Sequence, residues 1–180
     1  MSGLVVFAKS DDFGYFDKGN EASARVLEYG SDVDPKNIVP DIYDVWDNDP
    51  DMFDCLFLVA HGNAGVLSLG SGIGRFRAAH FALLRGTFMA GARGIEIHGC
   101  ACASSTDISR WHGEGTASAK GPGYEFLASM AKHSGVKITA PVDSISGYRA
   151  AYSYDGGRTM TVYPTGSCYF SNYKKGAKYA

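Results

Sequence analysis

The sequence predicts an α/β fold with a mainly parallel sheet, helices on both faces of that sheet and a C-terminal antiparallel hairpin. Short apolar runs that are typical of strands buried on both faces lie at residues 4–8 and 55–60, and residues 94–98 predict a third strand. Segments with apolar residues at helical spacing separate these runs, and this alternation favours parallel strands. Near the C-terminus, an Asp-Gly-Gly turn at 155–157 lies between the segments 148–154 and 159–163, as in a hairpin.

The composition is that of a folded protein. The chain has 180 residues, 45% of them hydrophobic, which predicts a single domain over residues 1–180 with a polar, basic tail from about residue 171. A formal net charge of −2 argues against nucleic acid as a partner. No run approaches the roughly 18 apolar residues of a membrane span, and the N-terminus lacks the features of a signal peptide. We therefore expect no membrane contact, and either a cytoplasmic location or export without an N-terminal signal.

The cysteine pattern predicts neither a disulfide framework nor a metal site. The four cysteines are Cys55, Cys100, Cys102 and Cys168, and no two of them form a Cys-x-x-Cys pair. A core of this size needs no disulfides. The 23 glycines are aperiodic, so they are expected to serve turns and close backbone approaches. No cofactor-binding motif is complete, and we expect neither a metal nor a cofactor.

The first half of the chain alternates between candidate strands and helices. Residues 20–29 have apolar side chains at helical spacing and end at Gly30, which predicts a helix. Residues 38–51 are acidic and contain prolines, which favours a connection with a short strand at most. Residues 66–69 alternate between flanking glycines and predict a hairpin arm, whereas 76–89 has a helical pattern.

The second half predicts a long loop and one more helix and strand before the hairpin. Residues 104–122 are polar and rich in glycine, and a loop of this length in a compact domain is usually functional or mobile. Residues 124–133 form an amphipathic pattern closed by Gly135, which predicts a helix. Residues 136–140 predict a fourth strand.

Two of the predicted strands end in similar chemistry. One runs into His61-Gly62 and the other into Gly99-Cys100. The carboxyl ends of parallel strands meet at one edge of a sheet, so this histidine and cysteine are expected to approach each other. An imidazole beside a thiol can accept its proton and activate it as a nucleophile. The backbone N–H groups of Gly62 and Cys100 are then candidates for an oxyanion hole.

Other residues compete for these roles. Cys102 is a second candidate nucleophile or a neighbour packed under the loop, and we favour Cys100. His98 is a candidate base, although a histidine inside a strand is more often a core residue, and His112 would need its loop to close over the site. The loop's Ser104, Ser105 and Asp107 contain the elements of a serine triad with a histidine, but no Gly-x-Ser-x-Gly elbow is present.

Three segments resemble the caspase-like, clan CD cysteine peptidases. They are LFLVAHGNAGVLSLG from Leu56, IEIHGCACAS from Ile95 and GPGYEFLASMAKHSGVKIT from Gly121. Within the clan, the chain is most similar to the self-processing cysteine peptidase domain of large bacterial toxins and to uncharacterised caspase-like domains of bacterial surface proteins. The resemblance implies a caspase-like three-layer sandwich, with His61 as the catalytic histidine and Cys100 as the nucleophile. It further implies a cysteine endopeptidase acting on protein or peptide substrates, either self-processing or as a bacterial effector.

The resemblance covers about half the chain and leaves specificity open. The caspase pentapeptide around the nucleophile is absent, so no aspartate preference is implied. By analogy with the clan, Asp143 and Ser144 border the primary specificity pocket, where an acidic Asp143 would favour a basic side chain. Asp11 and Asp12, which follow the first strand, are equally placed.

The resemblance also raises the question of an activator. The toxin domains bind inositol hexakisphosphate through a basic patch. The basic residues that cluster late in this sequence are Arg149, Arg158, Lys174, Lys175 and Lys178. A solvated tail is the favoured explanation for these residues, with an inositol phosphate activator as the alternative.

Two other functions fit the same residues. One is a caspase-like binding or interaction module in which the His–Cys pair is inactive. The other is a cysteine acyltransferase or hydrolase that uses the pair on a non-peptide substrate. The sequence alone does not separate the latter from peptidolysis.

Overall fold

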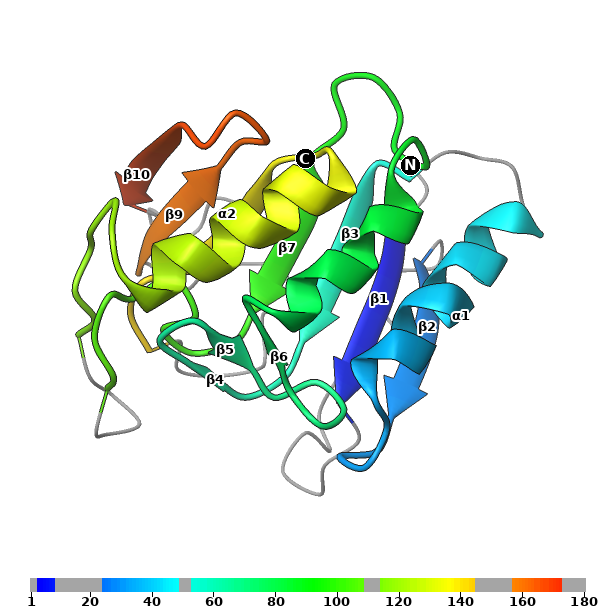
Figure 1. Ribbon diagram of the computed structural model, residues 1–180, viewed down its shortest axis with the longest axis horizontal. Coiled ribbons are helices and arrows are strands. Elements are labelled where there is room, and N and C mark those ends of the chain that lie inside the picture. Colours follow the sequence, from blue (N-terminus) through cyan, green and yellow to red (C-terminus); the bar gives the residue numbers. More distant parts are fainter. Residues whose placement is uncertain (1–2, 9–23, 49–52, 109–113, 145–156, 173–180) are drawn as a thin grey trace.

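A computed structural model of the chain describes residues 3–8, 24–48, 53–108, 114–144 and 157–172 (Figure 1). These residues form an α/β fold with a seven-stranded sheet in the order β10-β9-β8-β7-β3-β1-β2 and a small three-stranded sheet. The strands of the large sheet are β1 (Gly3–Ala8), β2 (Ala24–Tyr29), β3 (Cys55–Val59), β7 (Gly94–His98), β8 (Ile138–Pro141), β9 (Arg158–Val162) and β10 (Cys168–Asn172). The small sheet contains β4 (Gly62–Asn63), β5 (Val66–Leu67) and β6 (Ile73–Gly74).

The large sheet is mostly parallel, as the sequence predicts. Strands β2, β1, β3, β7 and β8 run parallel to their neighbours, and β9 and β10 are added antiparallel at one edge. The first three predicted strands are β1, β3 and β7, which lie next to one another in the sheet. Every residue of β3 and β7 is buried. Burial on both faces explains why β3 is apolar throughout, whereas β7 alternates isoleucines with the buried polar residues Glu96 and His98.

Three helices cover one face of the sheet. They are α1 (Pro35–Asp47), the 3₁₀ helix η2 (Arg77–Leu84) and α2 (Pro122–Ser134), and they lie side by side in front of the strands (Figure 1). The crossovers from β2 to β3, to β7 and to β8 all advance in one direction across the sheet, so right-handed connections put their helices on the same face. The helices expected on the second face are not among the described residues. None of the described helices has the length and apolar character needed to cross a membrane.

The two faces of the sheet differ in chemistry. The face toward the helices is apolar across adjacent strands, as in the aligned residues Val6, Leu58 and Ile97, which are fully buried. The opposite face contains buried polar side chains, among them Glu96 and His98 of β7. Hydroxyl pairs also lie on this second face, such as Thr139 Oγ1 and Thr161 Oγ1 at 2.8 Å.

The structure corrects two predicted elements in the first half. The predicted helix over 20–29 is wrong, because residues 24–29 form β2 and pair residue for residue with β1. The predicted connection over 38–51 is also wrong, because helix α1 covers most of it. Pro35 occupies its first turn and Asp34 caps it, with Oδ1 accepting from Lys36 N at 2.9 Å.

The burial of its apolar side chains stabilises α1 despite an internal proline. Ile38, Val39 and Ile42 are fully buried in the core, whereas Pro40 is exposed on the opposite side of the helix. This arrangement removes one backbone hydrogen bond but keeps the apolar stripe intact.

The later elements agree with prediction in type more than in boundaries. The helix predicted over 76–89 is the shorter 3₁₀ helix η2, and the predicted hairpin arm at 66–69 contains β5. Helix α2 ends at Gly135, which has a φ of 78°, as predicted for a left-handed cap.

The C-terminal hairpin uses a different partner strand. Strand β9 covers most of the predicted 159–163 segment, but it pairs with β8 and with β10. The expected partner at 148–154 lies outside the described residues. Strand β10 falls in a stretch for which no strand was predicted.

The apolar face gives a test of the core. We expect Leu58→Ala, at a fully buried position of β3, to lower the free energy of unfolding by about 2–5 kcal/mol. The same change at Leu83, which is 43% exposed, removes little buried surface and should cost much less. Urea denaturation of both variants makes the comparison, and equal losses would contradict the assignment of this face.

Candidate active site

The site begins with the register between β3 and β7. These strands are adjacent and parallel, with Val59 opposite His98 at their carboxyl ends. The pairing continues past the strand, since Ala60 N donates to His98 O at 3.4 Å. If this register continued for two residues past the strand ends, His61 would lie opposite Cys100. The candidate base His61 and the candidate nucleophile Cys100 therefore follow two neighbouring strands at the same edge of the sheet.

The two strand ends are tied together by contacts beyond the sheet. The thiol of Cys102 donates to the Val66 carbonyl at 3.1 Å, and Gly65 N donates to Cys102 O at 3.1 Å. Asn63 Oδ1 accepts from Ile108 N at 3.0 Å, which joins the histidine side to the loop that follows the cysteine. The hairpin after His61 therefore packs directly on the Cys100–Cys102 turn.

Gly62 is required by this packing. A Cβ atom built on Gly62 would lie 2.3 Å from Cys102 Sγ and 3.0 Å from Cys100 O. Ser68 N donates to His61 O at 2.7 Å, so His61 and Ser68 are a hydrogen-bonded pair at the end of the β4–β5 ladder. In an antiparallel ladder, hydrogen-bonded pairs alternate with pairs that are not hydrogen-bonded. Gly62 and Leu67 are consequently a non-bonded pair, and the Gly62 N–H points away from β5.

The turn that holds Cys100 has an unusual backbone. Ala101 has a φ of 49°, the only positive φ of a non-glycine among the described residues. Its N–H donates to Asp143 O at 3.0 Å, while Cys102 N donates to Gly99 O at 3.4 Å and Ala103 N to Pro141 O at 3.0 Å. These three amides are thereby excluded as oxyanion donors.

The structure separates the two candidate thiols. Cys102 is fully buried, and burial together with the neighbouring Cys100 raises the pKa of its thiol well above the ordinary value. A buried protonated thiol that donates to a carbonyl is a packing group. Cys100 retains 8% exposure at the sheet edge and stays the better candidate nucleophile.

The competing histidines and serines have other surroundings. His98 is buried on the second face, with Nε2 at 3.8 Å from Glu96 Oε2 and its ring 5.7 Å from that of Phe57. Ser104 Oγ donates to Thr106 O at 2.6 Å and accepts from the Thr106 and Thr116 amides at 3.2 and 3.0 Å, so it serves the loop. His112, Asp11 and Asp12 lie outside the described residues.

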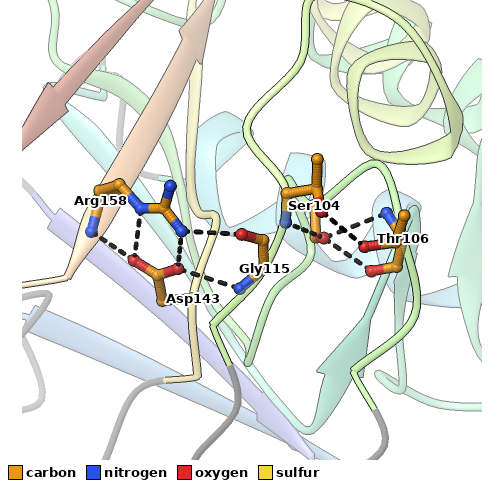
Figure 2. Close-up of polar contacts among 6 residues, drawn as sticks. Ser104, Thr106, Gly115, Asp143 and Arg158 are labelled. Carbon is orange, nitrogen blue, oxygen red and sulfur yellow. Dashed lines mark hydrogen bonds and ion pairs between the residues drawn. The ribbon is translucent and has the colours of Figure 1, made fainter.

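Asp143 makes contacts that the sequence did not indicate. Its carboxylate oxygens lie 2.6 Å from Arg158 Nη2 and 3.1 Å from Arg158 Nε, and they also accept from the amides of Arg158 at 2.9 Å and Gly115 at 3.0 Å (Figure 2). Burial opposes the charged form, but these hydrogen bonds outweigh it and lower the pKa of Asp143 below its ordinary value. The carboxylate is therefore neutralised by a residue of the chain itself.

The remaining predicted substrate and activator residues are only partly described. Ser144 is half-buried, and its hydroxyl has no hydrogen-bond partner within the described part of the chain. Among the late basic residues, Arg158 is described, and its guanidinium is engaged with Asp143 and Gly115. Arg149, Lys174, Lys175 and Lys178 lie outside the described residues.

The sequence did not indicate two residues of this edge, Asn63 and Ala101, or the pairing of a third, Arg158, with Asp143. Asn63 follows the His-Gly pair, Ala101 follows the cysteine, and Arg158 pairs with Asp143. Only Asn63 had a local signal, because Asn is common in tight hairpin turns.

The described residues contain no metal-binding cluster, and the comparisons with known proteins identify no relative. Within the described segments, no three His, Cys, Asp or Glu side chains are grouped to hold a metal ion. All four cysteines lie in described segments, and none forms a disulfide. Comparison of the chain with protein-family models, curated proteins and solved structures finds no significant match.

The close approach of Gly62 to Cys102 predicts a coupled pair of substitutions. Gly62→Ala should destabilise the fold by about 1–3 kcal/mol, because the new methyl group overlaps the Cys102 sulfur. Cys102→Ala removes that sulfur, so the double variant should be more stable than the sum of the two single losses by at least about 0.5 kcal/mol. Urea denaturation of the four proteins completes the cycle, and strict additivity would count against the contact.

The Asp143 carboxylate predicts a pH dependence of stability. A depressed folded-state pKa contributes stability that is present above the ordinary value of about 3.9 and is lost as the pH falls through the folded-state value. The stability difference between wild type and Asp143→Asn should stay constant from neutral pH to about pH 5 and then shrink. Urea denaturation across this range measures it, and a difference that is independent of pH would oppose this account.

Proposed function

We propose that the chain is a caspase-like cysteine endopeptidase in which Cys100 is the nucleophile and His61 is the general acid and base. The observation that carries the proposal is the parallel register of β3 and β7, which ends with Val59 opposite His98, so that His61 and Cys100 each follow two residues later at the same carboxyl edge. The contacts of Cys102, Gly65 and Asn63 across that edge support it, because they hold the two strand ends together.

The proposed reaction needs only a peptide and water. The Cys100 proton moves to His61, and the sulfur attacks the scissile carbonyl carbon to give a tetrahedral intermediate. His61 then gives its proton to the departing amine as the carbon–nitrogen bond breaks, leaving a thioester on Cys100. Water attacks this thioester while His61 takes its proton, so a carboxylic acid leaves and the thiol is restored.

The backbone at the edge supplies electrostatic stabilisation in this scheme. The oxyanion would accept from the amides of Gly62 and Cys100. The orientation of the Gly62 N–H, away from β5, supports this role, and so does the absence of a side chain on that residue.

A hollow of about 290 Å³ lies next to the hairpin that packs on the Cys100 turn, and the two share Val66. Its lining residues are Val66, Ser71, Gly72, Gly74, Phe76 and Arg77. Val66 is 44% and Phe76 82% exposed, so the hollow would offer apolar side chains to a peptide that extends beyond the site.

Removal of the nucleophile tests the proposal. We expect Cys100→Ala to abolish cleavage of a peptide library, and His61→Ala to lower it by about a hundredfold or more. Cys168→Ala and His80→Ala, which change the same residue types at the far sheet edge and on η2, should leave cleavage unchanged. Mass spectrometry of the products makes the comparison, and equal cleavage by Cys100→Ala and wild type would end the proposal.

Thiol labelling separates an active enzyme from an inactive binding module. At mildly acidic pH, iodoacetamide should modify Cys100 of the wild type faster than Cys168, because an imidazole partner keeps a nucleophilic thiol reactive there. His61→Ala should remove this advantage. Peptide mapping gives both rates, and a Cys100 rate that does not depend on His61 would favour the inactive module.

A further inference from the structure

We propose that Asp143 and Arg158 are positioning residues that hold the backbone of the turn at Cys100–Ala103. This role replaces the recognition of substrate that is expected of Asp143 from the sequence. The inference rests on the proposed function only for its effect on cleavage. Its structural part concerns the Cys100–Ala103 backbone and stands on contacts alone.

The guanidinium of Arg158 binds both carboxylate oxygens of Asp143, and we call this bidentate pair the fork. Both Asp143 oxygens accept from the Arg158 guanidinium, and each accepts one further backbone N–H (Figure 2). The Asp143 side chain is only 15% exposed. A basic substrate side chain would have to displace Arg158 from an arrangement of charge-assisted hydrogen bonds, which are roughly twice as strong as neutral ones. The contacts therefore argue for an internal role.

This fork is joined directly to the candidate nucleophile. The carbonyl of Asp143 accepts the N–H of Ala101, the residue next to Cys100, at 3.0 Å. Ala101 is held at a φ of 49°, in the left-handed region that is unfavourable for a residue with a Cβ atom, so contacts from outside the turn must maintain it. Asp143 supplies one such contact through its backbone and is itself held through its side chain.

The same fork holds the loop on the other side of the turn. Arg158 Nη2 donates to Gly115 O at 2.7 Å while Gly115 N donates to Asp143, so residue 115 is gripped at both backbone groups. A Cβ on Gly115 would lie 1.8 Å from Val142 O, so only glycine fits between β8 and the loop. From there Thr116 N reaches Ser104 Oγ at 3.0 Å, three residues after Ala101.

The geometry of arginine is part of the argument. One guanidinium contacts both oxygens of Asp143 and the carbonyl of Gly115. A lysine ammonium carries the same charge but is a point donor without the planar fork. The proposal therefore predicts that charge alone at position 158 does not hold the turn.

The experiment compares Arg158→Gln, Arg158→Lys and Asp143→Asn with Glu125→Gln. Glu125 pairs with Arg75 at the exposed start of α2 and belongs to a different ion pair. The first readout is amide hydrogen exchange of the 100–104 segment relative to β3, in each folded variant. The second is the rate at which iodoacetamide modifies Cys100 at pH 6, and the third is kcat and KM for a cleaved peptide.

We expect Arg158→Gln and Asp143→Asn to speed exchange in the 100–104 segment by about tenfold or more, as the loss of a charge-assisted hydrogen bond predicts. Labelling of Cys100 at pH 6 and kcat should fall, with KM changed much less. Arg158→Lys should resemble Arg158→Gln, and Glu125→Gln should resemble wild type.

The outcomes separate the two proposals. Unchanged exchange at 100–104 in folded Arg158→Gln, or full rescue by Arg158→Lys, overturns the positioning role whatever the activity. Faster exchange at 100–104 in Arg158→Gln, together with equal cleavage by Cys100→Ala and wild type, would support the positioning role and reject the peptidase. If Arg158→Gln does not fold, Arg158→Lys, which keeps the charge, decides by the same exchange measurement.

Discussion

The parallel pairing of β3 with β7 is the constraint on which the rest of the structure depends. Both strands are buried on both faces, so their register is fixed by packing on each side and a one-residue slip would exchange the two faces. With Val59 opposite His98, the chain after each strand emerges at matched height. The hairpin after His61 and the turn after Cys100 then pack against each other at that edge.

The edge is completed by segments that return to it from later in the chain. Pro141 at the end of β8 supplies a carbonyl to the Ala103 amide, and Asp143, two residues later, supplies one to the Ala101 amide. Strand β9 supplies the guanidinium that holds Asp143. The charges of Asp143 and Arg158 at this edge therefore hold segments of the chain in place. Buried polar groups here are mostly paired with backbone, which limits the number of arrangements that the turn can adopt.

Much of the fold followed from the sequence, but less of the site. The apolar runs of β1 and β3 have no alternative to burial, and the isoleucines of β7 continue the pattern, so the parallel core and its carboxyl edge were predictable. Residues 24–29 were misassigned because a short apolar segment beside a strand reads equally well as a helix, and its pairing with β1 decides. Helix α1 was not predicted because prolines usually interrupt helices, although Pro35 suits a first turn. The Asp143–Arg158 pair depends on the antiparallel register of β8 and β9, which no local pattern reveals.

The order of these contacts along the chain has a consequence for when the site exists. His61 and Cys100 are both made before residue 101, but the backbone conformation at Ala101 depends on carbonyls at 141 and 143 and on a side chain at 158. A chain growing from its N-terminus therefore contains both candidate residues well before it can hold the turn at Cys100–Ala103 in its final arrangement. The turn reaches that arrangement only after β9, which carries Arg158, has been made.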